Sequence, residues 1–270
     1  MKNLVSTDWL EKNLNNVRIL DASWHMPNTG RNPMDEFLNI HIQNANFFDL
    51  DKTSNQSSNL PHMLPEKKNW EKSVSELGIK NSDHIIIYDN SDVLSSCRSW
   101  YNFLYFNHNS NLVSVLDGGL KKWMNENKNT TKEVKIFSKS SYTAKENSLL
   151  VLNKDQINLN IKKKLFELVD ARSKERFQGL QPEPRKELKR GNIDGSKNIP
   201  FMEVINNDNT FKIKGDLKTI FEELELDTNK DLVFTCGSGV TACVLGLANS
   251  IISGKNPVIY DGSWAEYGII

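Results

Sequence analysis

Residues 231–248 read Asp-Leu-Val-Phe-Thr-Cys-Gly-Ser-Gly-Val-Thr-Ala-Cys-Val-Leu-Gly-Leu-Ala, and their pattern is the most informative local feature of the chain. An apolar run over 232–235 stops at Cys236, a loop with two glycines follows, and small and apolar residues continue from position 242. The pattern predicts a buried strand, a tight loop and the start of a helix. A helix N-terminus presents unpaired N–H groups and a partial positive charge, so we expect the thiol to exist largely as the nucleophilic thiolate.

Four segments of the first half of the chain recur in the second half, in the same order. The matched segments are 19–23 with 168–172, 41–45 with 192–196, 85–89 with 232–236, and 116–123 with 260–264. Such a repeat indicates a duplicated domain. Short apolar runs alternate with helix-like stretches in each copy, which predicts a mostly parallel sheet flanked by helices. We therefore expect an α/β protein of two tandem domains, which also suits the length of 270 residues.

The predicted domains cover residues 1–127 and 151–270, and the polar stretch 128–150 between them is expected to be an exposed linker. The position that aligns with Cys236 holds Asp89, and the loop that follows has no glycine. An aspartate cannot act as a sulfur nucleophile. The N-terminal domain is therefore predicted to be non-catalytic and the C-terminal domain to be catalytic.

Charge and cysteine content argue against several classes of protein. The 34 basic and 34 acidic residues cancel, which argues against a nucleic-acid or membrane-surface partner. No apolar stretch approaches the roughly 20 residues of a membrane span, and the first residues lack the apolar region of a signal peptide. Three cysteines without a CxxC pair argue against a disulfide framework and a zinc site. We expect a cytoplasmic protein that uses no metal and no cofactor.

The loop after the predicted strand has the composition of an anion-binding site. Gly237 and Gly239 allow the main-chain N–H groups of the loop, including those of Val240 and Thr241, to converge on one point. Ser238 adds a hydroxyl group to the same loop. These residues are therefore candidates for substrate binding around the thiol.

A cysteine in this setting can also be an inert core residue or the nucleophile of a phosphatase. A buried cysteine is usually an inert core residue, and we expect that role for Cys97 and Cys243, which lie in helix-like segments. Cysteine-dependent phosphatases share the strand–loop–helix layout but need an arginine six positions after the cysteine to hold phosphate. Ala242 occupies that position, so phosphate chemistry is not predicted.

Two arginines and one histidine lie in loops of restricted geometry. Arg176 and Arg185 belong to residues 175–185, where one glycine and two prolines forbid a continuous helix. They suit either planar recognition of a carboxylate or a solvated basic surface, and both interpretations remain open. His62 lies between two prolines, and Asp51 precedes the same Ser- and Asn-rich loop. A histidine there could move protons or be incidental.

The chain resembles the two-domain rhodanese-type sulfurtransferases over nearly its whole length, and among them the 3-mercaptopyruvate branch. The resemblance is carried by the loop 236–241 and the Pro-Glu-Pro-Arg segment at 182–185. Further matching segments are 20–24, 47–51, 61–65, 116–120 and 260–266. Thiosulfate-preferring members typically carry a basic pair after the cysteine, and this chain has Gly237 and Ser238 there.

The resemblance implies a covalent mechanism. Cys236 would attack the sulfur of 3-mercaptopyruvate, giving a persulfide and pyruvate, and a thiol acceptor such as a thioredoxin, or cyanide, would take the outer sulfur. It also implies that Arg176 and Arg185 bind the carboxylate and keto oxygens of the donor. The residues implied to form a proton relay are Ser238, His62 and Asp51.

Two alternatives remain: a thiosulfate sulfurtransferase of the same fold, and a non-catalytic sulfur carrier or binding module. The chain also departs from the His-Ile-Pro-Gly-Ala segment that is common in both halves of the family. The first copy has Gln43 and Asn44 in place of the proline and glycine, and the second has Asn192 in place of the histidine. These segments usually form a structural turn, so the departures are expected to affect stability more than chemistry.

Overall fold

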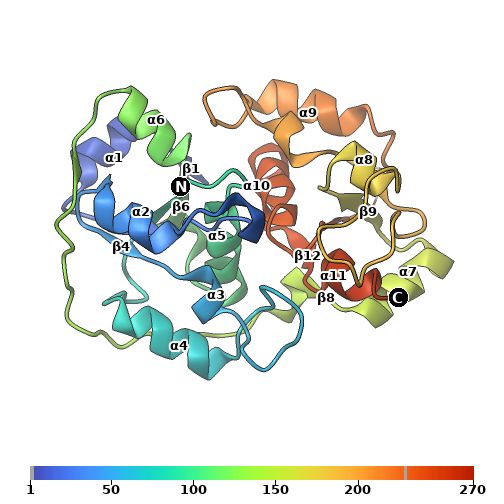
Figure 1. The fold of residues 1–270 in the computed structure, drawn as a ribbon, viewed down its shortest axis with the longest axis horizontal. Coiled ribbons are helices and arrows are strands. Elements are labelled where there is room, and N and C mark those ends of the chain that lie inside the picture. Colours follow the sequence, from blue (N-terminus) through green and yellow to red (C-terminus); the bar gives the residue numbers. More distant parts are fainter. Residues whose placement is uncertain (1–2, 228–229) are drawn as a thin grey trace. The chain divides into compact units, whose positions relative to one another are not determined.

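The computed structural model describes residues 3–227 and 230–270; positions 1–2 of the predicted first domain and 228–229 of the predicted second lie outside the described residues. The chain divides into two compact units. Unit 1 comprises the described residues up to Gln56, Leu64–Asn147 and Asn207–Thr210. Unit 2 comprises Ser57–Met63, Ser148–Asn206 and the described residues from Phe211 onward. Figure 1 shows the helices and strands of both.

Unit 1 is built on a five-stranded sheet in which every pairing is parallel. Its order is β1 (Leu4–Val5), β6 (Val113–Leu116), β5 (Ile85–Tyr88), β2 (Arg18–Asp21) and β4 (Ala45–Phe47). Its helices are α1 (Thr7–Asn13), η1 (Pro27–Thr29), α2 (Pro33–Asn39), α3 (Leu50–Thr53), α4 (Lys67–Glu76), α5 (Ser96–Tyr105), η2 (Ser110–Leu112) and α6 (Gly119–Asn125). The central strand β5 is buried along its whole length, as expected for a parallel strand covered on both faces.

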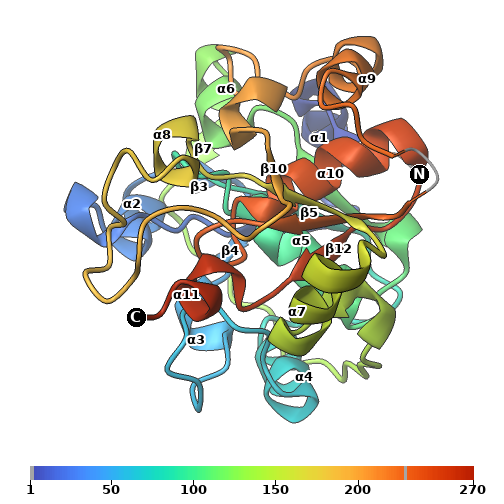
Figure 2. The same cartoon turned by 90° about the vertical axis from the view of Figure 1, so that its right-hand side faces the viewer.

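Unit 2 repeats this plan. Its sheet order is β10 (Lys197–Asn198), β9 (Glu167–Asp170), β11 (Leu232–Thr235), β12 (Val258–Tyr260) and β8 (Val151–Leu152), again with parallel pairings throughout. Its helices are η3 (Ser148–Leu150), α7 (Lys154–Lys163), α8 (Lys174–Phe177), η4 (Phe201–Val204), α9 (Lys214–Glu222), α10 (Ala242–Ser253) and α11 (Ser263–Tyr267). Figure 2 shows α9 and α10 on one face of this sheet and α7 and α11 on the other.

The alternation of side chains along the strands explains the two covered faces. In β11, Val233 packs with Ile157 of α7 and Trp264 of α11, whereas Phe234 meets Phe221 of α9, with the ring centroids 6.3 Å apart. Successive side chains of a strand point to opposite faces, so an unbroken apolar run supplies both layers. The strand order of unit 1 recurs in unit 2 with corresponding strands in corresponding places. The predicted tandem α/β fold is confirmed.

The segment 128–150, expected to be an exposed linker, is exposed along most of its length, and as far as Asn147 it packs on unit 1. Residues Thr130–Thr131 form β7, which pairs antiparallel with β3 (His41–Ile42). Tyr142 is buried and stacks on His108, with the ring centroids 5.9 Å apart. The polar composition of the segment concealed this packing because few apolar side chains are enough to anchor an extended segment.

The departures from the family turn have structural substitutes. Asn44 adopts φ 67°, close to the φ of 79° at Gly195 in the second copy. Asparagine tolerates this left-handed region better than most residues, so the turn is kept without glycine. Asn192 donates from Nδ2 to the carbonyl oxygen of Phe177 at the end of α8, at 3.0 Å. His41 makes the corresponding contact to a carbonyl of α2 through Nδ1. Among the described residues, no helix is both long and apolar enough to cross a membrane.

Candidate active site

Cys236 is the first residue after β11, and its surroundings hold it rigidly. The residue is buried, with 1% of its surface exposed. Its carbonyl oxygen accepts a hydrogen bond from the N–H of Trp264 at 2.9 Å, and its own N–H donates to Oγ of Ser263 at 3.3 Å. The carbonyl oxygen of Gly237 accepts from the N–H of Ala265 at 2.9 Å. The start of α11 therefore fixes the start of the loop that carries the thiol.

The rest of the loop leaves its donors free. Among the residues that the structure describes, none accepts a hydrogen bond from the main-chain N–H of Gly237, Ser238, Val240 or Thr241. Gly239 has φ 76°, a left-handed conformation that reverses the chain and that glycine adopts at no steric cost. Helix α10 begins directly after this loop and has no side-chain cap. Unpaired N–H groups at a helix start attract anions, so the loop suits a thiolate or a persulfide.

The structure brings two of the three predicted relay residues together. His62 belongs to unit 2 although it comes from the first half of the sequence. It is buried, it has φ 59°, and its Nδ1 lies 3.0 Å from Oγ of Ser238. Asp51 belongs to unit 1, where its carboxylate accepts hydrogen bonds from Nε1 of Trp24 at 3.0 and 3.1 Å.

The two predicted substrate arginines have different surroundings. Arg176, at the end of α8, is one-quarter exposed and pairs with Glu183. Its Nη2 would lie 3.1 Å from a Cβ atom placed on Gly237, so the guanidinium lies against the catalytic loop. Arg185 is half-buried, and among the described residues its side chain has no hydrogen-bond or ion-pair partner. Substrate binding by Arg185 therefore stays a prediction.

Three residues around the loop were not singled out from the sequence: Arg172, Glu183 and Ser263. Arg172 is buried and bonds to both Asp170 and Glu183. Ser263 has φ 49° and accepts the hydrogen bond from Cys236. The alignment of the two copies contained a signal for two of them, because Arg172 aligns with Ser23 and Ser263 with Gly119.

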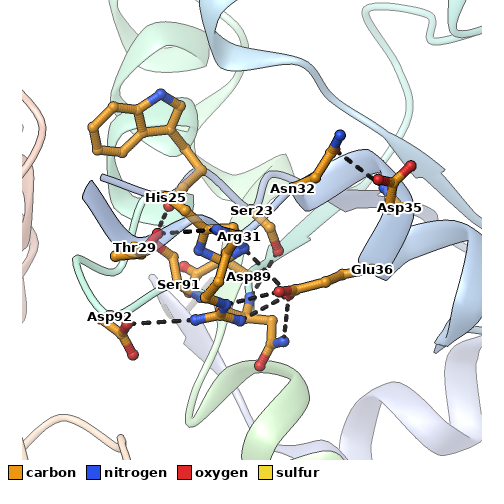
Figure 3. Close-up of polar contacts among 12 residues, drawn as sticks. Ser23, His25, Thr29, Arg31, Asn32, Asp35, Glu36, Asp89, Ser91 and Asp92 are labelled. Atoms are coloured by element: carbon orange, nitrogen blue, oxygen red, sulfur yellow. Dashed lines mark hydrogen bonds and ion pairs between the residues drawn. The ribbon is translucent and has the colours of Figure 1, made fainter. Parts of the chain in front are cut away.

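The equivalent position of unit 1 is closed by Asp89. Its carbonyl oxygen accepts from the N–H of Leu120 at 3.0 Å, as Cys236 accepts from α11 in unit 2. Its carboxylate accepts from the N–H groups of Ser91 at 2.9 Å and of Ser96, the first residue of α5, at 2.8 Å. Burial raises the pKa of Asp89. A carboxylate therefore occupies the N-terminus of α5, the place in unit 1 that corresponds to the loop after Cys236. Figure 3 shows Asp89 and Ser91 among the polar contacts of this region.

The other two cysteines lie in the core, as predicted. Cys97 lies in α5 and Cys243 in α10, and neither has any exposed surface. The thiol of Cys243 donates to the carbonyl oxygen of Gly239 at 3.2 Å. All three cysteines are free thiols, and only Cys236 lies at the loop with unpaired N–H groups.

Comparison with known proteins identifies the family of the chain. A family model described as the rhodanese-like domain matches residues 6–126 and again residues 153–269. The chain is 39% identical over 273 residues to the 3-mercaptopyruvate sulfurtransferase of Mus musculus, across 98% of this chain and 91% of that relative. It is 37% identical over 273 residues to the thiosulfate sulfurtransferase of Bos taurus, with the same shares covered. The crystal structure of SseA from Escherichia coli, a 3-mercaptopyruvate sulfotransferase with the rhodanese fold, matches with a TM-score of 0.88 at 31% identity, covering 98% of this chain and 99% of that one.

Proposed function

This chain belongs to the rhodanese family of sulfurtransferases, and on that basis we propose that it moves a sulfur atom from 3-mercaptopyruvate through a Cys236 persulfide to a thiol acceptor. The observation that carries the proposal is the buried thiol at the end of β11, beside four main-chain N–H groups that have no acceptor within residues 3–227 and 230–270. Such donors stabilise negative charge on sulfur in each anionic state of the cycle.

In the first half-reaction the Cys236 thiolate attacks the mercapto sulfur of the donor. The new S–S bond forms as the C–S bond breaks, and the electron pair of the C–S bond passes to the carbon as the enolate of pyruvate. The mercapto proton goes to that carbon, which completes pyruvate. Ser238 and His62, with Oγ and Nδ1 3.0 Å apart, provide a route for this proton. Asp51 is kept as the third member of the proposed relay.

In the second half-reaction a thiolate acceptor attacks the outer sulfur of the persulfide. The S–S bond breaks, the outer sulfur leaves with the acceptor, and the Cys236 thiolate is restored. A reduced thioredoxin fits this role because its thiol pair can release the sulfur as sulfide and form its own disulfide. Cyanide is the small-molecule equivalent and gives thiocyanate.

Thiosulfate is the alternative donor. It is a dianion, and a cationic loop would favour it, whereas Gly237 and Ser238 after the nucleophile are neutral. Arg176, whose charge lies against Gly237, is already paired with a buried carboxylate. These features favour a monoanionic donor whose carboxylate can be recognised by a planar guanidinium.

Steady-state assays with each donor test the proposal. We expect pyruvate release from 3-mercaptopyruvate to exceed thiocyanate formation from thiosulfate and cyanide in kcat/KM. A reversed preference would establish the thiosulfate alternative, and turnover of neither donor would leave only a non-catalytic sulfur carrier. Cys236→Ser should remove the mass of one sulfur atom that the donor adds to the intact protein. An adduct that persists in this variant on Cys97 or Cys243 would refute the assignment of the nucleophile.

The proposal includes a reducing, cytoplasmic compartment, because a persulfide intermediate and three free thiols need protection from oxidation. Fractionation of cells that express the full-length protein with a C-terminal tag tests this location. Enrichment of the tag in an organelle fraction would contradict it.

A further inference from the structure

Glu183 joins the cation at the catalytic loop to a buried charge network. Its Oε2 accepts from Nη2 of Arg176 at 2.5 Å and its Oε1 from Nε of the same residue at 3.4 Å. Its Oε1 also accepts from Nη1 of Arg172 at 2.8 Å. The Glu183 side chain is only 1% exposed, whereas that of Arg176 is 25% exposed. The carboxylate therefore holds the Nε–Nη2 edge of Arg176 from the protein side.

The network behind Glu183 is rigid. Arg172 has no exposed side-chain surface, and it donates to Asp170 through Nε and Nη2 at 3.0 and 2.7 Å. It also donates to the carbonyl oxygen of Gly191 at 2.9 Å, and its guanidinium lies 4.4 Å from the ring centroid of Trp264. Fully bonded ionic groups in a buried network have little freedom to move. Arg172 thus fixes Glu183, and Glu183 in turn fixes Arg176.

Unit 1 also has an arginine–glutamate pair beside its loop, formed by Arg31 and Glu36 at other sequence positions than Arg176 and Glu183, and this pair is closed (Figure 3). Arg31 donates to Glu36 through Nε and Nη2, both at 2.7 Å, and to the carbonyl oxygen of Asn90 at 2.9 Å. Its remaining nitrogen, Nη1, donates to Asp92 at 3.4 Å. Asn90 follows the residue at the nucleophile position and also donates to Glu36 from its own amide. Every nitrogen of the Arg31 guanidinium is therefore occupied by protein.

In unit 2 the guanidinium of Arg176 is open. Gly237 stands where unit 1 has Asn90, so no side chain covers Arg176 there. Among the described residues, Nη1 of Arg176 has no acceptor. In unit 2, therefore, Glu183 holds one edge of the Arg176 guanidinium, and the other edge can bind a ligand.

We propose that Glu183 is a positioning residue that aims the free edge of Arg176 at the carboxylate of the sulfur donor and, by its charge, favours a monoanionic donor over dianionic thiosulfate. The inference rests on the proposed function. Orientation matters because a planar carboxylate binds a guanidinium edge in one plane. Charge matters because the paired carboxylate offsets the cation that a dianion would need.

Two substitutions test separately the orientation of the Arg176 guanidinium and the charge of Glu183. Glu183→Asp keeps the charge but withdraws the carboxylate by one methylene group from Arg176. We expect KM for 3-mercaptopyruvate to rise about tenfold, with kcat and the KM for thiosulfate nearly unchanged. Glu183→Gln keeps the shape but leaves the guanidinium uncompensated. The ratio of kcat/KM for thiosulfate to that for 3-mercaptopyruvate should then rise about tenfold or more.

Two matched variants control for loss of stability. Glu36→Gln breaks the arginine–glutamate pair of unit 1, and Glu187→Gln removes an exposed carboxylate near the Glu183 loop. Both should leave the ratio of kcat/KM for thiosulfate to that for 3-mercaptopyruvate within about twofold of the wild-type value. The rate at which iodoacetamide alkylates Cys236 reports whether the loop is intact in each variant.

A cycle with Arg176→Lys completes the test. Since Glu183 acts through Arg176, adding Glu183→Asp to Arg176→Lys should raise KM no further than about twofold. Additive effects, or a fall in kcat for both donors with unchanged KM and slowed alkylation, would assign Glu183 a purely structural role. If Glu183→Gln does not fold, the Glu183→Asp cycle still decides. Wild-type protein that turns over neither donor would reject the proposed function itself.

Discussion

Asp21 is a buried carboxyl group at the end of β2, and among the described residues no cation pairs with it. Its Oδ1 accepts hydrogen bonds from the N–H and Oγ of Ser23, at 3.0 and 2.6 Å. Burial is the main reason that the pKa of Asp21 rises from 3.8 to about 6, and the nearby Asp89 adds to the rise. The folded state therefore binds this proton more tightly than the unfolded chain. Ionisation above about pH 6 destabilises the fold, and the penalty disappears as pH falls from 6 to 3.8.

Asp21→Asn should remove this penalty. At about 1.4 kcal/mol per pKa unit, a rise from 3.8 to about 6 corresponds to about 3 kcal/mol at neutral pH. Oδ1 of asparagine can still accept both bonds from Ser23, but the hydroxyl of Tyr88 loses its carboxylate acceptor, which costs about 1 kcal/mol. The net gain is about 2 kcal/mol, or roughly 6 °C in the unfolding midpoint of a unit of this size.

Calorimetry at about pH 7.5 and about pH 4 checks the size and the sign of the predicted change in the free energy of unfolding. The gain should be present at the higher pH and vanish at the lower. Asp170→Asn is the matched control, because Asp170 occupies the same strand position in unit 2 but pairs with the buried Arg172. It should lose about 3–5 kcal/mol at neutral pH, because it leaves a buried cation without its main partner. A less stable Asp21→Asn protein at pH 7.5, or an equal gain at both pH values, would refute the reasoning.

Three further predictions concern the catalytic loop. Arg185→Lys should raise KM for 3-mercaptopyruvate about tenfold, because a point charge replaces a planar fork, and unchanged kinetics would remove Arg185 from the site. Gly237→Ala places a methyl group 3.1 Å from Nη2 of Arg176 and should raise KM for 3-mercaptopyruvate several-fold at unchanged stability. Gly215→Ala, which has open space around it, should leave this KM unchanged. Equal KM values for the two variants would contradict the proposed contact. Ser263→Gly relieves about 1 kcal/mol of left-handed backbone strain but leaves the buried N–H of Cys236 without its acceptor. We therefore expect kcat to fall while the unfolding midpoint changes little. A wild-type kcat would show that this hydrogen bond does not position the thiol.

Local patterns were sufficient to predict the elements around the thiol. The apolar run at 232–235 became β11, and the helix predicted from position 242 became α10. The signals here are short-range: burial of a continuous apolar run, glycine at the positive φ of position 239, and small residues at a helix start. The repeat also predicted the second sheet, because duplicated sequence folds to the same strand order.

Side-chain partners far apart in the sequence could not be predicted in this way. The ion pair of Glu183 with Arg176 forms because a loop with two prolines folds back onto α8. The contact of Arg172 with the ring of Trp264 joins residues that are far apart in the sequence. The packing of residues 128–147 on unit 1 was missed for a similar reason. Their polar composition is typical of a linker, and only a few buried side chains such as Tyr142 anchor them.

The tandem α/β plan, the candidate nucleophile and the neutral loop residues beside it were predictable from the sequence, because these features depend on residue type and short spacing. Tertiary structure decided which charges reach that loop and in what state. It paired Arg176 with a buried carboxylate, placed His62 against Ser238, and filled the equivalent site of unit 1 with Asp89. The physical reason is that the strength of a charge depends on burial and on its partners, and both are set only when distant segments meet.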